Sequence, residues 1–121
     1  MRNARLWFLS IIAAWLIVIL LSIHMALLHL NDILTFFGVN NLVEPTSWDS
    51  MIERARQGIW VFIYIALLVT TLYHALYGLR NIILERTPSA GIERVVTGII
   101  IVVGVIFLVL GTYVPIALVS S

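Results

Sequence analysis

The sequence predicts an all-α protein, an integral membrane three-helix transmembrane bundle that forms a single domain over residues 1–121. Two observations support this fold class. The chain is 62% hydrophobic and only 11% charged. It also contains three runs of more than twenty residues that lack Asp, Glu, Lys and Arg, namely 6–31, 57–79 and 95–121. Each run exceeds the roughly 20 residues that a helix needs to cross a hydrocarbon core.

The first helix is predicted over about residues 6–31. Arg2 and Arg5 precede it, and Trp7 stands where an indole ring prefers the membrane interface. Its apolar part is longer than the roughly 7–15 residues of a signal-peptide core, and no small-x-small cleavage site follows it. We therefore expect a retained membrane span.

The second helix is predicted over about residues 51–86, after a polar connection in which Pro45 is a breaker. Ser50 and Glu53 have the spacing of a capping box, so we expect this helix to begin near Met51. The candidate functional residues of this helix, His74, Gly78, Arg80 and Glu85, all lie in its second half. The second helix is therefore the centre of the functional prediction.

The third helix is predicted over about residues 92–118, after a short connection that contains Pro88 and Gly91 and suits an antiparallel helix hairpin. Three glycines follow at spacings of six and seven, Gly98, Gly104 and Gly111. Small residues on one stripe permit close contact between membrane helices. Pro115 is expected to mark the outer end of this helix.

The arginines predict the orientation of the chain in the membrane. Five of them flank the N-terminus and the second connection, Arg2, Arg5, Arg80, Arg86 and Arg94, whereas the first connection has two, Arg54 and Arg56. By the positive-inside rule the N-terminus is cytoplasmic and the C-terminus lies outside. The chain has no cysteine, which excludes c-type haem attachment and iron–sulfur ligation by this chain. Any metal cofactor must therefore depend on histidine.

His74 is the strongest candidate for a functional group, because ionisable residues inside a membrane span are rare and usually functional. Burial in lipid favours neutral imidazole, which is the form that binds iron. Gly78 is four residues later and shares its helix face, which leaves a notch where a flat cofactor can lie. Glu85, eleven residues after His74, returns to within about 20° of that face.

The three histidines are expected at different depths. His24 lies seventeen residues after Trp7, about 26 Å from the cytoplasmic boundary, whereas His74 precedes Arg80 by six residues and lies about 9 Å from the same boundary. These two side chains cannot bind one iron, so each needs a partner from another chain or only one is a ligand. His29 points about 140° away from His24, and we favour a solvated or headgroup-contacting role for it.

Other functional candidates have two readings each. His24 is either a ligand or a structural histidine. Arg80 is either an anchor whose side chain extends to the lipid headgroups or a counter-ion for haem propionates. Glu85 is either an ordinary interfacial carboxylate or a group that assists proton uptake by a quinone.

The spacing of His74, Gly78, Arg80 and Glu85 resembles that in the small three-helix membrane anchor subunits of succinate dehydrogenase and fumarate reductase. In those subunits the second helix carries a haem-ligating His, a Gly four later, often an Arg six later and an acidic residue eleven later. The smaller D-type anchors are the nearer match. One anchor type has Asp followed by Tyr at the acidic position, where this chain has Glu85 and Arg86, so a quinone-binding tyrosine is not transferred.

This resemblance implies a cytochrome b-type subunit of a succinate:quinone oxidoreductase in the cell inner membrane, one that is not catalytic alone. It would share one or two b-type haems with a second membrane anchor subunit, and it would dock an iron–sulfur subunit and a flavoprotein subunit. His74 would bind the haem iron next to Gly78 and Arg80, His24 a possible second haem iron, and Glu85 would lie near the quinone substrate. Lipid is the remaining partner, and no nucleic acid is expected.

Two other functions are compatible with the same residues. The chain could be a haem-free scaffold subunit in which His74 hydrogen-bonds a neighbouring helix. It could also be a small transporter or channel component with His24 and His74 as proton-relay groups. The latter is disfavoured because the first and third spans have almost no polar stripe.

Overall fold

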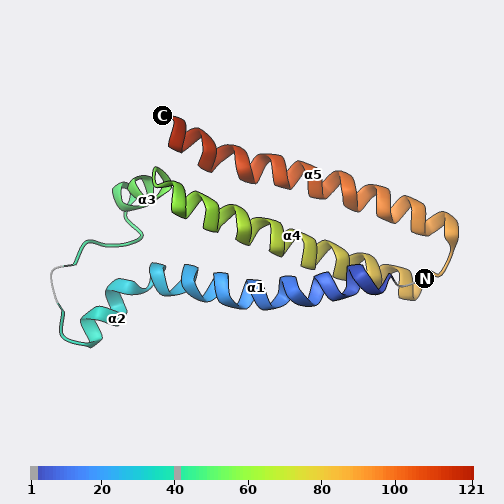
Figure 1. Ribbon diagram of the computed structural model, residues 1–121, viewed down its shortest axis with the longest axis horizontal. Coiled ribbons are helices and arrows are strands. Elements are labelled where there is room, and N and C mark those ends of the chain that lie inside the picture. Colours follow the sequence, from blue (N-terminus) through green and yellow to red (C-terminus); the bar gives the residue numbers. More distant parts are fainter. Residues whose placement is uncertain (1–2, 40–41) are drawn as a thin grey trace.

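The computed structural model describes residues 3–39 and 42–121, and all regular structure in them is helical. Five helices follow one another, α1 (Ala4–Leu28), α2 (Leu30–Phe36), α3 (Trp48–Ala55), α4 (Gly58–Arg86) and α5 (Ala90–Ser120) (Figure 1). By length and composition, α1, α4 and α5 are each able to cross a membrane. The prediction of an all-α chain with three candidate membrane spans is confirmed, and it indicates a multi-pass membrane protein.

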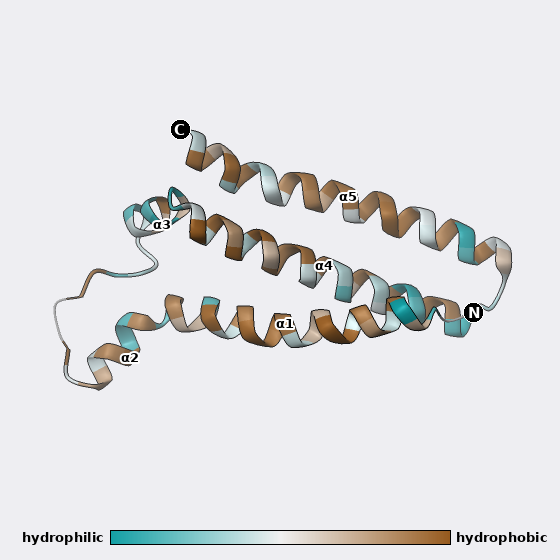
Figure 2. Cartoon of the chain, in the orientation of Figure 1, coloured by the Kyte–Doolittle hydropathy of each residue, from teal (hydrophilic) through white to brown (hydrophobic). Residues whose placement is uncertain are grey.

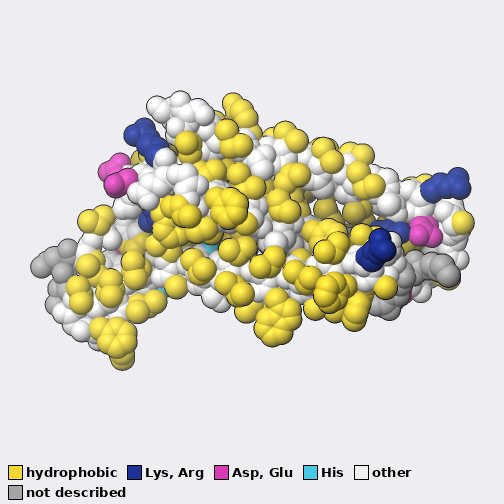
Figure 3. Space-filling model, in the orientation of Figure 1, with side chains coloured by type: hydrophobic (Ala, Val, Ile, Leu, Met, Phe, Trp, Pro, Cys, Tyr) yellow, Lys and Arg dark blue, Asp and Glu magenta, His cyan; other side chains and the backbone are white. Residues whose placement is uncertain are grey.

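The surface has the polarity that a membrane protein needs. Apolar residues extend along α1, α4 and α5 in Figure 2. On the face seen in Figure 3, hydrophobic side chains cover the middle of the molecule, and charged side chains gather at its two ends. Such an apolar band between two polar ends matches the hydrocarbon core and the two headgroup regions of a bilayer.

The three long helices form one open layer with α4 in the middle (Figure 1). α4 packs against both α1 and α5, whereas no Cα atom of α1 comes within 8 Å of one in α5 in the described chain. Over the whole of residues 4–28, 58–86 and 90–120, only Ser10 and Ala13 are buried. Most apolar side chains of the spans are therefore available to lipid or to other chains.

The α1–α4 contact follows one stripe of α1. Its members alternate at spacings of three and four residues and are all buried or half-buried, Ser10, Ala13, Ile17, Leu20, His24 and Leu27. This is the heptad spacing of two helices that cross at a small angle. Two small residues, Ser10 and Ala13, lie where the helices approach most closely, with exposures of 8% and 5%.

The α4–α5 contact uses glycines of α5. A Cβ atom built on Gly104 would be 3.0 Å from Cδ1 of Leu76, and one built on Gly111 would be 2.5 Å from Cδ2 of Leu68. These two glycines therefore admit leucines of α4 close to the backbone of α5, as the small-residue stripe predicts. Gly98 differs, because a Cβ atom there would meet nothing within 4 Å.

The second predicted helix is divided into α3 and α4. The capping prediction at Ser50 is wrong: Ser47 is the N-cap of α3, and its Oγ accepts a hydrogen bond from the Ser50 backbone N–H at 3.4 Å. Ser50 is already inside α3. Gln57 has an extended backbone, with φ −88° and ψ 120°, so the chain leaves helical geometry before α4 begins at Gly58. The candidate membrane span is α4 alone.

The ends of the first and third helices also differ from the sequence prediction. α1 ends at Leu28, and a bend at His29 (φ −100°, ψ 12°) separates it from the short helix α2. α5 continues to Ser120 with Pro115 inside it, so Pro115 does not mark the end of the helix. Because proline has no N–H, the carbonyl of Gly111 lacks its usual helical donor at this turn.

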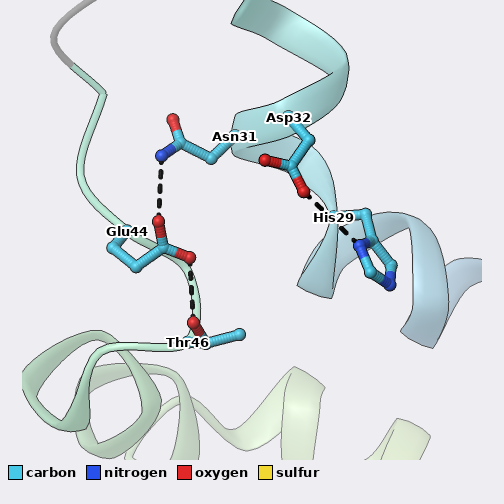
Figure 4. Close-up of polar contacts among 5 residues, drawn as sticks. All are labelled: His29, Asn31, Asp32, Glu44 and Thr46. Atoms are coloured by element: carbon cyan, nitrogen blue, oxygen red, sulfur yellow. Dashed lines mark hydrogen bonds and ion pairs between the residues drawn. The ribbon is translucent and has the colours of Figure 1, made fainter.

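A polar network joins α2 to the loop that follows it (Figure 4). Asn31 Nδ2 donates to one carboxylate oxygen of Glu44 at 3.0 Å, and Thr46 Oγ1 donates to the other at 2.8 Å. The hydrogen bonds from Thr46 and Asn31 hold the pKa of the Glu44 carboxyl below its usual value of 4.5. His29 and Asp32 form an exposed ion pair nearby, with 3.6 Å between Nδ1 and Oδ2.

A leucine at Gly111 is expected to destabilise the α4–α5 contact, because its side chain would overlap Leu68. Overpacking of this kind lowers the free energy of unfolding by about 1–3 kcal/mol. Thermal unfolding of the purified protein in detergent, followed by circular dichroism, measures the change. Gly98→Leu is the matched control, since that position faces open space. Equal melting temperatures for the two variants would contradict the packing assignment.

The Glu44 network is expected to weaken in acid. The folded-state pKa of Glu44 is lowered, so its stabilising contribution is present above pH 4.5 and is lost as the pH falls through the folded-state value. Hydrogen exchange of peptides covering α2, corrected for intrinsic rates, should show increasing opening in this range. Glu44→Gln removes the titrating group and should flatten the response; an unchanged pH dependence in that variant would assign it to another group.

Candidate functional site

His74 of α4 is hydrogen-bonded to the backbone of α1. Its Nδ1 lies 3.0 Å from the carbonyl oxygen of Ser10 and 3.2 Å from Ser10 Oγ. A carbonyl oxygen only accepts hydrogen bonds, so the shorter contact assigns the imidazole proton to Nδ1. Nε2 then carries the lone pair, and it has no hydrogen-bond partner within residues 3–39 and 42–121. This nitrogen is the one available to a ligand.

Tyr73 makes a second contact of the same kind. Its hydroxyl donates to the carbonyl oxygen of Leu6 at 2.7 Å. Leu6 and Ser10 are one turn apart on α1, and Tyr73 and His74 are neighbours on α4. We call these four residues the carbonyl clamp. The ring of Tyr77 stacks on that of Tyr73, with 5.7 Å between centroids and an interplanar angle of 9°, which further restricts the Tyr73 side chain.

A groove of about 360 Å³ adjoins the imidazole on the outer side of α1. It is lined by His74 and by one stripe of α1, Trp7, Ser10, Ile11, Ala14, Trp15 and Val18. Trp15 is 67% exposed, so the groove is open toward the membrane rather than enclosed. Gly78, one turn after His74, also faces open space, because a Cβ atom there would meet nothing within 4 Å. A flat group can therefore approach this part of α4 without a steric obstacle from the chain.

Arg80 points away from this groove. Six residues separate it from His74, which is about 120° around the helix. Its Nε donates to Thr97 Oγ1 at 2.8 Å, and its Nη2 pairs with Glu93 Oε1 at 2.9 Å. Arg80 thus joins α4 to α5. The structure does not bring it to the imidazole of His74.

Glu85 lies at the end of the molecule where α4 turns into α5. It lines a cavity of about 400 Å³ together with Tyr77, Arg80, Asn81 and Glu93. An adjoining apolar groove of about 450 Å³ between α4 and α5 shares Tyr77 and Arg80 with this cavity. The cavity also includes Asn3 and Leu6 at the start of α1, so it lies at the end of the molecule where all three long helices meet, and the only α1 residue that it shares with the groove beside it is Leu6.

His24 occupies the other half of the α1–α4 contact. Its ring meets that of Tyr64 edge to face, with 5.8 Å between centroids. Its Nδ1 is buried and has no hydrogen-bond partner in the described chain. Fourteen residues separate His24 from Ser10, the partner of His74, which corresponds to about 21 Å along α1. The two imidazoles therefore belong to two separate places.

The chemistry available at these places is that of single ligands. Within residues 3–39 and 42–121, no group of three or more His, Asp or Glu side chains is placed to hold a metal ion. His74 has a fixed ring, a donating Nδ1 and an uncommitted Nε2, which is the arrangement found in metal-bound histidines. His74 is therefore able to act as a single ligand from this chain.

Sequence reasoning missed several of the residues that build these places. Ser10, Tyr73 and Tyr64 each contact one of the two histidines or hold α4 against α1. Ser10 carried a usable signal, since a serine within an apolar run needs a hydrogen-bond partner inside the membrane. The tyrosines did not, because a tyrosine in a membrane helix is equally expected as an interface anchor.

No family model matches the chain, and comparisons with curated proteins and with solved structures find no match. The fold and the candidate site thus define a class only, a small helical protein with three candidate membrane spans.

Proposed function

We propose that this chain is a haem-bearing membrane anchor subunit of a succinate:quinone oxidoreductase. One observation carries the proposal: His74 is held by Nδ1 and presents an uncommitted Nε2 beside an open groove in a membrane span. A hydrogen bond from Nδ1–H to a backbone carbonyl orients a metal-binding histidine and increases the basicity of its other nitrogen. Bound b-type haem would supply one-electron storage beside the route to quinone.

The openness of the groove favours a shared cofactor. This chain lines one side with the indoles of Trp7 and Trp15 and offers a single axial ligand. A second membrane anchor subunit would supply the other ligand and cover the remaining porphyrin face. The arginine distribution supports a cytoplasmic location for the α4–α5 turn, where the iron–sulfur and flavoprotein subunits would dock. The chain would thus be an inner-membrane subunit that is not catalytic alone.

The polar cavity at the α4–α5 turn is the proposed quinone-proximal place. Glu85 faces it with an exposed carboxylate, and Arg80 supplies a cation that is already paired with Glu93. A carboxylate beside a quinone can assist proton uptake when the quinone is reduced. Because Arg80 faces this cavity rather than the His74 groove, its proposed contact with a haem propionate requires that the propionate reach the α4–α5 side.

His24 is the proposed ligand of a second haem. The partnerless Nδ1 supports this role, because a buried nitrogen without a hydrogen bond is unusual and calls for an explanation. In the present arrangement the ring packs against Tyr64. Ligation by His24 therefore requires a small rotation of the imidazole toward the partner subunit.

A haem-free scaffold subunit is the second candidate, and the carbonyl clamp favours it. In this function, Tyr73 and His74 serve only to hold α4 against α1 through their hydrogen bonds. The two functions assign different roles to Nε2. Nε2 of His74 binds the haem iron in the haem-bearing subunit and has no ligand in the haem-free scaffold.

His74→Ala is expected to remove b-type haem, because it deletes the proposed axial nitrogen. The reduced-minus-oxidised spectrum and the pyridine haemochrome content of the purified complex measure the loss. His29→Ala is the matched control, since His29 is exposed and lies outside the three candidate membrane spans. If His74→Ala retains wild-type haem content, or the wild-type complex contains none, the scaffold function replaces the haem proposal.

Gly78→Leu is expected to reduce haem content strongly without disturbing the fold. Nothing lies within 4 Å of a Cβ atom at Gly78, so a leucine fits the chain itself but occupies the space beside His74. Haem per complex and the melting temperature should be measured together. Gly98→Leu, at another open glycine in a long helix, should change neither quantity. Full haem occupancy in Gly78→Leu would show that the porphyrin does not lie over this glycine.

A further inference from the structure

α2 has one polar and one apolar side. At 100° per residue, its apolar positions and the following Phe37 fall within a sector about 100° wide, and they are Leu30, Ile33, Leu34 and Phe37. Its polar positions fall on the opposite side, and they are Asn31, Asp32 and Thr35. Phe36 falls about 60° outside the apolar sector, between Ile33 and Asp32. A segment of this kind has one side suited to water and one suited to a hydrocarbon boundary.

The protein itself occupies the polar side of α2. Asn31 donates to Glu44 of the following loop, and Asp32 pairs with His29 (Figure 4). Within the described chain, Leu34 is half-buried and the other residues of the apolar side are exposed. Phe36 is 85% exposed and Phe37 is 74% exposed, and their rings contact each other edge to face at 5.4 Å. The loop is therefore attached to the side of α2 that a membrane would not contact.

The position of α2 identifies what covers the apolar side. α2 begins two residues after the end of α1, and α1 is its only helical neighbour in the described chain. In Figure 1, α2 continues from the end of α1 and lies away from α3. Its apolar side is thus continuous with a helix that crosses the membrane, and it is at the depth where that helix leaves the hydrocarbon.

We propose that α2 lies in the lipid interface, with Leu30, Ile33 and Phe37 inserted at the boundary between headgroups and acyl chains. The occupant of this apolar side is the bilayer surface at the end opposite the α4–α5 turn. Residues 29–39 contain Asp32 and no Lys or Arg, so anionic lipids are not needed for the contact. An isolated helix of seven residues binds lipid weakly. The attachment to α1 holds α2 at the membrane surface and so raises its effective concentration there.

Such an anchor would set the depth of the neighbouring end of α1. This inference depends on the three spans crossing a membrane and not on the haem proposal. The two can therefore fail separately, since the membrane depth of α2 and the haem content of the complex are independent measurements.

Site-directed spin labelling tests the proposal directly, because the chain has no cysteine to remove. Single-cysteine variants Ile33→Cys and Phe37→Cys sample the apolar side, and Asp32→Cys and Thr35→Cys sample the polar side. Each is labelled with a nitroxide and reconstituted as full-length protein in phosphatidylcholine vesicles. The ratio of collision with oxygen to collision with a water-soluble nickel chelate is expected to be several-fold higher at 33 and 37 than at 32 and 35.

Reference labels make the result decisive. Leu21→Cys, on the exposed surface of α1, reports the membrane interior, and Glu53→Cys, in α3, reports water. Water-like ratios at 33 and 37 would overturn the proposal. Shielding of both labels from oxygen and from nickel would also overturn it, because protein would then cover the face. If that shielding disappears at a lower protein-to-lipid ratio, the cover is a second copy of the chain. Adding phosphatidylglycerol should leave the ratios unchanged.

Discussion

The carbonyl clamp is the interaction on which the arrangement of this chain depends. Inside a bilayer the hydrophobic effect does not hold helices together, since lipid tails are as apolar as the side chains. Burial contributes little here, because only Ser10 and Ala13 are buried in the three long helices. The bonds from Tyr73 and His74 to the α1 backbone therefore fix the position of α1 on α4. Each such bond contributes about 0.6 kcal/mol on average, so the clamp defines geometry more than it adds stability.

The same contact prepares His74 for chemistry. A histidine that donates Nδ1–H to a carbonyl has a fixed ring and tautomer, and Nε2 remains uncommitted. Because α4 lies between α1 and α5, its residues are divided between two sides (Figure 1). His74 belongs to the α1 side, whereas Arg80 binds Thr97 and Glu93 of α5. In the proposed subunit, the haem place beside His74 and the quinone place beside Glu85 would thus be two separate sites along α4.

Particular residues show which structural features the local sequence pattern predicts and which it does not. The long uncharged runs predicted three spans, and the glycine stripe predicted the contacts of Gly104 and Gly111 with α4. Ser47 took the capping role expected of Ser50: only Ser50 has a Glu three residues later, but the extended backbone lies at Ser47, one turn earlier. The first helix was predicted to continue to residue 31, because His29, where the bend occurs, has no strong helix-breaking signal, and the rest of α2 was not predicted as a helix.

The amino-acid sequence alone determined that the chain contains three helices able to cross a membrane, where charge interrupts them, and that it has no cysteine to offer as a metal ligand. Length, apolarity and the absence of cysteine decide these properties without reference to neighbours. The tertiary structure alone decided which side of each helix is internal. The spans are apolar all round, so no periodic pattern distinguishes the α1 stripe of Ser10 and Ala13 from its lipid-facing side. The contact between α1 and α4 pairs Ser10 with His74, and the contact between α4 and α5 pairs Arg80 with Thr97.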